Sequence, residues 1–439
     1  MKRIVIAVAA TSLLAGCGIF EGSRGPRTPT VGQRIPVLSA EAAIEVDPEL
    51  AGVPVVLPAP AANAEWSQSG GNASKSMGHL ALGTAPAQAW SASIGQGSSN
   101  RGRLAAPPIV ADGRVYTIDT MSVVRAFSPE NGSTLWQAQV RGAEATDRTL
   151  FGGGISFANG RLYVTNGSGY ASALDPATGS VIWQVQPGGP LRGSPTIGNQ
   201  NVYVVTQDNQ IYALDEANGQ TRWTRAGASE SSGVFGTAAP AFAQSTVVAG
   251  YSSGELAAYR YENGQEVWTD ALARTTVTTA AHALSDIDAD PVIDQGRVYA
   301  IGQGGRMVAL ELNTGQRLWE LNIAGLSTPW VAGDWVFVVT DTAQLLAIAR
   351  ASGRIRWMTQ LQRFRDQEDR RGPISWRGPV LAGNRLVLVN SLGHIAYVSP
   401  VDGAVQGTIQ ARTPISLQPV VANNTLYILD DSGRLTAWR

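Results

Sequence analysis

The chain has 439 residues, of which 44% are hydrophobic and 15% are charged, so it can bury a large core and is not an intrinsically disordered protein. Its formal net charge of −1 excludes the broad basic field by which nucleic-acid-binding proteins attract their ligand. Lysine occurs only at Lys2 and Lys75, histidine at three positions and cysteine at one, which leaves little material for chemistry that depends on these side chains.

The first residues have the features of an exported lipoprotein. Lys2 and Arg3 precede an apolar run, residues 4–14, that is too short to cross a bilayer as a helix. The run ends in "LAGC", which resembles a bacterial lipobox, the signal after which cleavage leaves an acylated cysteine at the new N-terminus. We therefore predict a signal peptide over residues 1–16 and a lipid on Cys17.

A spacer is predicted between this anchor and the folded body. Gly18 follows Cys17, and by resemblance to enterobacterial sorting the absence of aspartate there favours the outer membrane. Residues 17–64 are rich in Pro, Ala and Gly, which is typical of a semi-extended linker, although "VPVVLPAP" is apolar enough to lie in part against the body. The body is expected to span residues 65–439, without a disulfide because Cys17 is the only cysteine.

One phrase recurs throughout the body. "ALDPATGSVIW", residues 173–183, has near-copies at 126–136, 213–223, 258–268, 309–319 and 347–357. A second phrase of the type "PPIVADGRVYTID" precedes each copy and starts eight units. The tryptophans of the repeat are Trp90, Trp136, Trp183, Trp223, Trp268, Trp319 and Trp357. At the next expected place stands Gly407.

The repeat predicts an all-β fold, an eight-bladed β-propeller with four antiparallel strands in each blade. Units of roughly 40–50 residues with four short strands are typical of propeller blades, and no sustained helical period is present. The eighth unit begins at Pro419 and has three strands before the chain ends. A strand at about 83–95, which contains Trp90, is expected to complete it and close the ring.

The repeated phrase has the chemistry of a turn between packed strands. Asp175 can accept hydrogen bonds from the backbone that follows it, Pro176 sets φ, and Gly179 supplies a positive φ. Trp183 lies on the outermost strand, where burial of about 150–250 Å² of indole surface would join neighbouring blades. We therefore interpret the phrase as structural rather than catalytic.

The same pattern, A-x-D-x-x-T-G-x-x-x-W, resembles the docking motif of the pyrroloquinoline quinone (PQQ) dehydrogenases. That resemblance implies a cofactor held by two adjacent cysteines, a catalytic Asp and a Ca²⁺-binding Glu/Asn/Asp set, whereas this chain has one cysteine. Its carboxylate cluster "DIDAD", residues 286–290, lacks the Gly and terminal Glu of an EF-hand loop. We predict no cofactor, no metal site and no enzymatic activity; a PQQ-type quinoprotein or another ligand-binding propeller is the alternative.

One face of the ring is predicted to be the working face. The connections after each tryptophan share this face, and the long ones are residues 137–154, 224–239, 269–290 and 358–378. The mixed-charge stretch "RFRDQEDRR" (363–371) has two interpretations, a solvated loop or a partner contact.

Lipobox, spacer, eight tryptophan-motif blades and the absence of catalytic residues together resemble the BamB family, the outer-membrane protein assembly factor B of the β-barrel assembly machinery. The resemblance covers the lipobox and residues 65–439, and is most specific at "LSDIDADPVI" and "SGVFGTAAP". In that family the corresponding loops, between blades three and four and between four and five, dock on a periplasmic POTRA domain of BamA. The residues implied to contact this partner are Val234, Phe235, Gly236, Asp286 and Asp288.

This sequence departs from the family pattern at two of the implied contacts. Phe235 stands where well-known members have Arg, and Ser232 where they have Leu, which indicates an altered partner surface. The resemblance implies a non-enzymatic, lipid-anchored scaffold on the periplasmic face of the outer membrane, with BamA, other machinery subunits and nascent β-barrel chains as partners. It leaves two mechanisms open, orientation of BamA or presentation of edge strands to incoming chains by β-augmentation.

Overall fold

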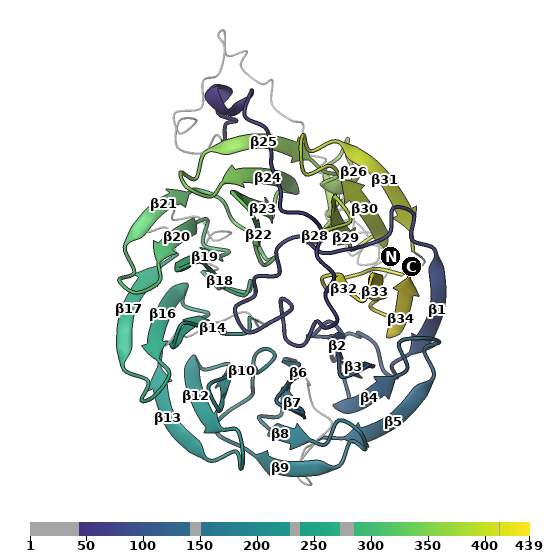
Figure 1. Cartoon of the computed structure of the whole chain (residues 1–439), viewed down its shortest axis with the longest axis vertical. Coiled ribbons are helices and arrows are strands. Elements are labelled where there is room, and N and C mark those ends of the chain that lie inside the picture. The colour runs from purple at the N-terminus through teal and green to yellow at the C-terminus, as the bar shows by residue number, and fades with distance from the viewer. Residues whose placement is uncertain (1–43, 141–150, 229–237, 273–284, 412) are drawn as a thin grey trace, which may run out of the picture. The chain divides into compact units, whose positions relative to one another are not determined.

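The computed structural model describes residues 44–140, 151–228, 238–272, 285–411 and 413–439, and Ile44–Arg439 is one compact unit. Within the described residues the strands form eight four-stranded antiparallel sheets, arranged as blades around a common axis, and one two-stranded hairpin (Figure 1). A short 3-10 helix, η1 (Pro48–Leu50), precedes them. The predicted eight-bladed propeller is therefore confirmed.

Each blade runs from its innermost to its outermost strand in chain order. Blade 1 comprises β2 (Ile109–Ala111), β3 (Arg114–Ile118), β4 (Val123–Phe127) and β5 (Thr134–Gln139). Blade 2 comprises β6 (Gly153–Ala158), β7 (Arg161–Asn166), β8 (Ala171–Leu174) and β9 (Val181–Val185). Blade 3 comprises β10 (Thr196–Gly198), β11 (Asn201–Val205), β12 (Gln210–Asp215) and β13 (Thr221–Ala226). Blade 4 comprises β14 (Ala241–Ala243), β15 (Thr246–Gly250), β16 (Glu255–Arg260) and β17 (Glu266–Ala271).

The second half of the ring continues in the same way. Blade 5 comprises β18 (Val292–Asp294), β19 (Arg297–Ile301), β20 (Met307–Glu311) and β21 (Arg317–Leu321). Blade 6 comprises β22 (Trp330–Ala332), β23 (Trp335–Val339), β24 (Gln344–Ala349) and β25 (Ile355–Gln360). Blade 7 comprises β28 (Trp376–Ala382), β29 (Arg385–Asn390), β30 (His394–Val398) and β31 (Val405–Gln410), and follows the hairpin β26 (Phe364–Asp366) and β27 (Arg371–Pro373).

Blade 8 is assembled from both ends of the unit. Its strands β32 (Val420–Ala422), β33 (Thr425–Leu429) and β34 (Arg434–Trp438) come from the C-terminus, and β1 (Gln88–Ser93) pairs antiparallel with β34 as the outermost strand. The register places Trp90 opposite Ala437. The predicted closure of the ring by a strand at about 83–95 is thus confirmed.

The seven motif tryptophans join consecutive blades. Each indole Nε1–H donates a hydrogen bond to a backbone carbonyl in the turn before the outermost strand of the next blade, for example Trp183 to Glu216 at 3.0 Å. The other donors are Trp90, Trp136, Trp223, Trp268, Trp319 and Trp357. The glycine of each following turn lies against the same ring, and a Cβ on Gly179 would come within 2.6 Å of the Trp136 ring. The motif therefore forms the contact between blades.

Gly407 in blade 7 takes the place of an eighth tryptophan, and the topology gives the reason. A tryptophan here would pack on the turn between the third and fourth strands of blade 8. No such turn exists, because these strands, β34 and β1, come from opposite ends of the unit. A Cβ added to Gly407 meets nothing within 4 Å.

Residues 63–80, which we call the hub, lie inside the ring and contact the innermost strand of every blade. Phe157 N–H of β6, for example, donates to Ser67 O at 2.7 Å, and Leu80 N–H donates to Leu381 O of β28 at 3.0 Å. In order around the ring, blades 8, 1, 2, 3, 4, 5, 6 and 7 are contacted by Asn63, Trp66, Ser67, Gln68, Ala73, Ser74, Gly78 and Leu80. The hub therefore pairs polar groups of inner strand edges that would otherwise face the axis.

Part of the predicted spacer also contacts the ring. Asp47 N–H donates to Ile355 O at 2.8 Å, and Arg356 Nε donates to Val53 O at 2.8 Å, so the stretch around η1 follows the outer edge of β25. The pairing of Arg354 with Asp47 and Glu49 adds charge complementarity. The compact unit accordingly begins at Ile44, before the predicted start of the body at residue 65.

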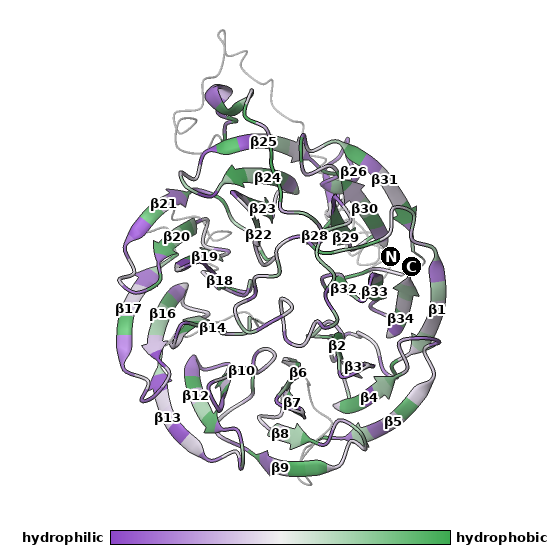
Figure 2. Ribbon diagram, in the orientation of Figure 1, coloured by the Kyte–Doolittle hydropathy of each residue, from purple (hydrophilic) through white to green (hydrophobic). Residues whose placement is uncertain are grey.

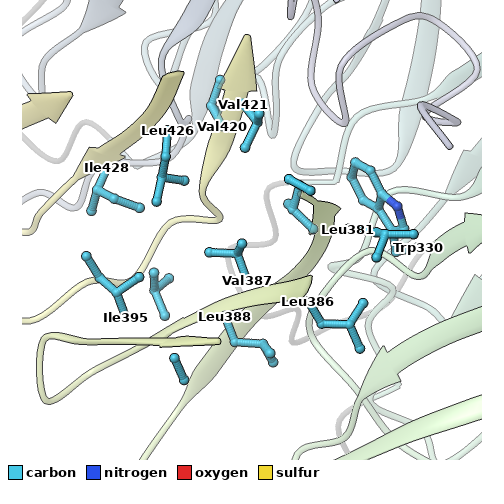
Figure 3. Packing of buried hydrophobic residues seen from close by; sticks show 14 of the residues in the cluster. Trp330, Leu381, Leu386, Val387, Leu388, Ile395, Val420, Val421, Leu426 and Ile428 are labelled. Carbon is cyan, nitrogen blue, oxygen red and sulfur yellow. The ribbon is translucent and has the colours of Figure 1, made fainter. Parts of the chain in front are cut away.

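The core lies between the blades and continues around the ring. Inner strands such as β11 and β23 are buried along their whole length, whereas outermost strands such as β13, mostly hydrophilic in Figure 2, bury their tryptophan and expose the other residues. The largest cluster of buried side chains joins blades 6, 7 and 8 to the hub and includes the stacked pair Trp66 and Trp330, with ring centroids 6.0 Å apart. Figure 3 shows Trp330 beside Leu381 within this cluster.

Candidate functional site

The structure describes part of the predicted partner site. Val234, Phe235 and Gly236 lie outside the described residues, as does Cys17, so their predicted roles stay predictions. Asp286 and Asp288 are described, and they immediately precede β18 of blade 5. They lie on the face that carries the connections between blades, as predicted from the chain order of the strands.

A cavity of about 620 Å³ opens at the centre of this face. Its walls come from connections that lead to the innermost strands, and Ser69 of the hub contributes to its lining. Polar groups on the wall include Asp288, Gln303 and Arg377, and apolar ones include Leu104 and Leu326. The hub therefore forms part of the wall of this cavity.

Asp286 is held inside the protein by an arginine from another blade. Its side chain and that of Arg192 are both fully buried, and Arg192 Nη2 donates to Asp286 Oδ1 at 2.6 Å. Burial raises the pKa of Asp286 to about 6, because desolvation outweighs the opposing effect of Arg192, and the nearby charge of Asp288 raises it further. Arg192 precedes β10 of blade 3 and Asp286 precedes β18 of blade 5, so the ion pair connects two blades that are separated by blade 4.

Asn209 extends this network to blade 4. It lies in the turn between β11 and β12, and Arg192 Nη1 donates to its Oδ1 at 3.4 Å. The same oxygen accepts from the backbone N–H and the hydroxyl of Ser252, which lies between β15 and β16. Asn209 Nδ2 donates to Ala228 O at 2.9 Å. Ala228 is the last described residue before the predicted docking loop. The network thus fixes the points from which both predicted docking loops leave the ring.

Asp288 occupies a different environment from Asp286. Its side chain is 15% exposed and lines the cavity, where one carboxylate oxygen accepts from Gln303 Nε2. Arg192 Nη2 lies 3.8 Å from the other oxygen, which has no hydrogen-bond partner among the described residues. Of the two predicted acidic contacts, Asp288 is accessible, whereas Asp286 positions the loop through Arg192.

Two buried charged residues, Asp290 and Lys75, connect the cavity wall to the hub. Asp290 accepts from Ser69 Oγ at 2.5 Å and from the backbone N–H of Ala239 at 2.7 Å. Lys75 Nζ donates to Thr196 Oγ1 at 3.1 Å, and burial lowers the pKa of Lys75 to about 8 although Asp290 acts in the opposite direction. The contacts of these two residues tie the hub to blades 3, 4 and 5.

The residues at the centre of the ring do not fit a PQQ site. Among the described residues no group of three or more His, Cys, Asp and Glu side chains could hold a metal ion. Two carboxylates of the cluster at residues 286–290 already have partners: Asp286 accepts a hydrogen bond from Arg192, and Asp290 accepts one from Ser69. Phe151 is the one aromatic residue that lines the described cavity, so the stack of aromatic rings expected of a sugar-binding propeller does not occur in its walls.

Comparison with known proteins identifies the family. The family model described as "Outer membrane protein assembly factor BamB" matches residues 120–359, more than half of the chain. The chain belongs to the BamB family. A BamB from Yersinia pestis is 26% identical over 361 residues, which cover 80% of this chain and 88% of the relative. A BamB from Vibrio cholerae is 36% identical over 256 residues, which cover 58% and 65%.

Solved structures share the fold. The crystal structure of BamB from Moraxella catarrhalis superposes with a TM-score of 0.64 at 20% identity and covers 81% of this chain and 98% of that one. A quinohemoprotein alcohol dehydrogenase from Comamonas testosteroni gives 0.66 at 13% identity, with 85% and 80% covered. At these identities the likeness concerns the propeller alone, since one fold carries unrelated functions. No helix among the described residues has the length and hydrophobicity needed to cross a membrane.

The residues that hold the candidate site together were not predicted from the sequence. Arg192, Asn209 and Gln303 were not predicted, because their partners lie 94, 43 and 15 residues away in the chain. One signal was available in "PLRGSP", where a lone arginine stands between small residues just before an inner strand. A charge at the entrance to a buried strand requires a partner, although its identity depends on the ring geometry.

Proposed function

We propose that this chain is a non-enzymatic adaptor of the β-barrel assembly machinery, anchored to the periplasmic face of the outer membrane by a lipid on Cys17. In this function the ring docks on a POTRA domain of BamA and assists the folding and insertion of outer-membrane β-barrel proteins. Membership of the BamB family, the outer membrane protein assembly factors, supports this assignment.

One observation carries the docking site. The buried network of Arg192, Asp286 and Asn209 joins blades 3, 4 and 5 at the two places from which the predicted docking loops emerge. A rigid base beneath two contact loops lowers the entropy cost of binding, because less conformational freedom is lost when the partner docks. This supports blades 3 to 5 as the docking region.

The two aspartates have separate roles in this proposal. Asp288 lines the cavity with a side chain that is 15% exposed, and its carboxylate is the acidic group that this proposal offers to the partner. Asp286 is fully buried and acts as a positioning residue through Arg192. Val234, Phe235 and Gly236 supply the apolar part of the contact, with Phe235 in place of the arginine of other family members.

Presentation of edge strands is the second mechanism. The outermost strands of blades 1 and 2 expose Leu135, Val181 and Ile182. The stretch around η1 shows that one such edge accepts an extended segment, since Asp47 N–H donates to Ile355 O of β25. Nascent β-chains would add to free outer edges in the same manner.

Calorimetry with the full chain in mild detergent and the POTRA domains of its own BamA tests the docking function. We expect micromolar binding by the wild-type protein and at least tenfold weaker binding by Asp288→Ala, which removes the accessible carboxylate. Asp334→Ala is the matched control, because Asp334 is exposed in the tight turn between β22 and β23 on the opposite face. No binding by the wild-type protein to any POTRA domain would refute the adaptor function.

A further inference from the structure

The hairpin β26–β27 is an insertion on the same face as the candidate site. It lies in the connection from β25 of blade 6 to β28 of blade 7, where Phe364 pairs with Pro373 and Asp366 with Arg371. Every residue from 365 to 373 is exposed. Arg377, four residues after the hairpin, lines the central cavity. The hairpin therefore stands at the edge of the docking face.

The base of the hairpin is held firmly by the ring. Ile374 N–H donates to Arg363 O at 2.9 Å, and Trp376 Nε1 donates to Gln362 O at 2.9 Å. Ile374 and Trp376 are themselves buried against blade 7. A two-stranded hairpin is marginally stable in isolation, so these contacts are what give the insertion a defined position.

The hairpin carries arginines that its own structure does not neutralise. Arg363, Arg365 and Arg370 form no ion pair with another described residue, and Arg371 reaches Asp369 only at 3.7 Å with both side chains mostly exposed. Asp366 is used for the turn, where its carboxylate accepts the backbone N–H groups of residues 368 and 369. The cationic groups are therefore available to a ligand.

A cleft of about 520 Å³ lies between the hairpin and the end of β25. The guanidinium of Arg363 sits 5.1 Å above the centre of the Phe364 ring, which presents an arginine and an aromatic surface together. Arginine and aromatic residues are the types enriched at protein–protein hot spots. The cleft is lined by Gln360, Leu361, Gln362, Arg363, Phe364, Gln367 and Arg370.

We propose that this cleft binds an acidic segment of a protein partner seated on the docking face, with carboxylates of that segment paired to Arg363 and Arg370, the two arginines that line it. The inference rests on the proposed function, because it makes the hairpin a second contact beside blades 3 to 5. The partner at this second contact is an extended segment with clustered Asp or Glu side chains.

The charge pattern favours a protein over an anionic membrane. Binding to anionic lipid requires clusters of four to eight basic residues, whereas Asp366, Glu368 and Asp369 stand at the tip of this hairpin between its arginines. A flat anionic surface would attract the four arginines of residues 363–371 and repel the three carboxylates between them, which leaves little net attraction. A protein surface with acidic groups opposite the arginines meets no such repulsion.

The test uses the full chain in detergent with three probes, namely the POTRA domains of its own BamA, a hexaglutamate peptide and phosphatidylglycerol vesicles. The variant is Arg363→Gln with Arg370→Asn, which removes both arginines that line the cleft, and asparagine tolerates the positive φ of Arg370. Arg260→Gln with Arg434→Gln is the control, because it removes the same charge from exposed arginines outside the hairpin.

We expect hexaglutamate binding that falls with salt and is lost in the hairpin variant, together with about tenfold weaker POTRA binding by that variant alone. Hexaglutamate binding unchanged by the hairpin substitutions, or vesicle binding without hexaglutamate binding, overturns the inference. POTRA binding that is equal in the wild-type and hairpin variant proteins overturns the inference and leaves the proposed function intact. Absence of POTRA binding by the wild-type protein refutes the proposed function, while the hexaglutamate result still decides the hairpin.

Discussion

Arg192 and Asp286 form a fully buried ion pair, with Nη2 2.6 Å from Oδ1, between connections that enter blades 3 and 5. Blade 4 lies between these blades and joins the pair through Ser252 and Asn209. Removing one member of a buried pair leaves an uncompensated charge, whereas removing both leaves none. This asymmetry makes the pair testable.

We predict that Arg192→Met lowers the free energy of unfolding by about 3–5 kcal/mol, because Asp286 is then buried without its partner. Arg192→Met with Asp286→Leu should cost clearly less than the sum of the single substitutions. Denaturant unfolding of the four proteins in a double-mutant cycle measures the coupling. Additive losses would show that the two side chains do not stabilise each other.

Gly179 and Gly113 form a matched pair for the contact between blades. Both have positive φ, 74° and 67°, but a Cβ on Gly179 would meet the Trp136 ring at 2.6 Å, whereas a Cβ on Gly113 meets nothing within 4 Å. Gly113→Ala should cost about 1–2 kcal/mol from the backbone conformation alone. Gly179→Ala should cost a further 1–3 kcal/mol or so from overpacking. Equal losses in denaturant unfolding would argue against the tight contact of glycine and indole.

Trp66 tests the contribution of the hub to the stability of the ring. The side chain is fully buried, stacks on Trp330 and belongs to the largest core cluster. Trp66→Ala is expected to lower the free energy of unfolding by about 3–5 kcal/mol, since it leaves a large void. Val56→Ala, in the same N-terminal stretch but 67% exposed, should change it by less than about 0.5 kcal/mol. If both variants unfold like the wild-type protein, the hub does not stabilise the ring.

Lys75 predicts a dependence of stability on pH. Burial lowers its pKa from 10.5 to about 8, so the folded chain releases this proton while the unfolded chain still binds it. Stability therefore rises with pH above about 8 by this group, up to roughly 3 kcal/mol when both states are deprotonated. Lys75→Met should lack the rise in unfolding experiments between pH 7 and 9.5. Tyrosine side chains also titrate at high pH, but they are the same in the wild-type protein and the Lys75→Met variant, so their effect cancels in the difference between the two stabilities. Parallel curves of stability against pH for the two proteins would contradict the assignment.

The repeat was sufficient to predict the architecture. A-x-D-x-x-T-G-x-x-x-W carries its own turn chemistry and places one tryptophan per unit, so the blade count, the role of Trp183 and the closure by β1 all follow from local pattern and spacing. These features depend on residues that are close together in the chain or on the number of strands, and the sequence alone is enough to recognise either. The predicted working face follows from the order of strands for the same reason.

The environment of each site residue was decided only by the tertiary structure. Asp286 and Asp288 are two residues apart and look equivalent in the sequence, yet one is fully buried against Arg192 and the other lines a cavity. Local sequence likewise does not predict that the hub lies inside the ring, where Trp66 and Lys75 are buried by strands that follow much later in the chain. The local sequence pattern determines the strands and turns of each blade, because the strands of a blade are mostly neighbours in the chain. Closure of the ring determines what lies at its centre, because there eight distant segments meet and their desolvation selects the partners of each charge.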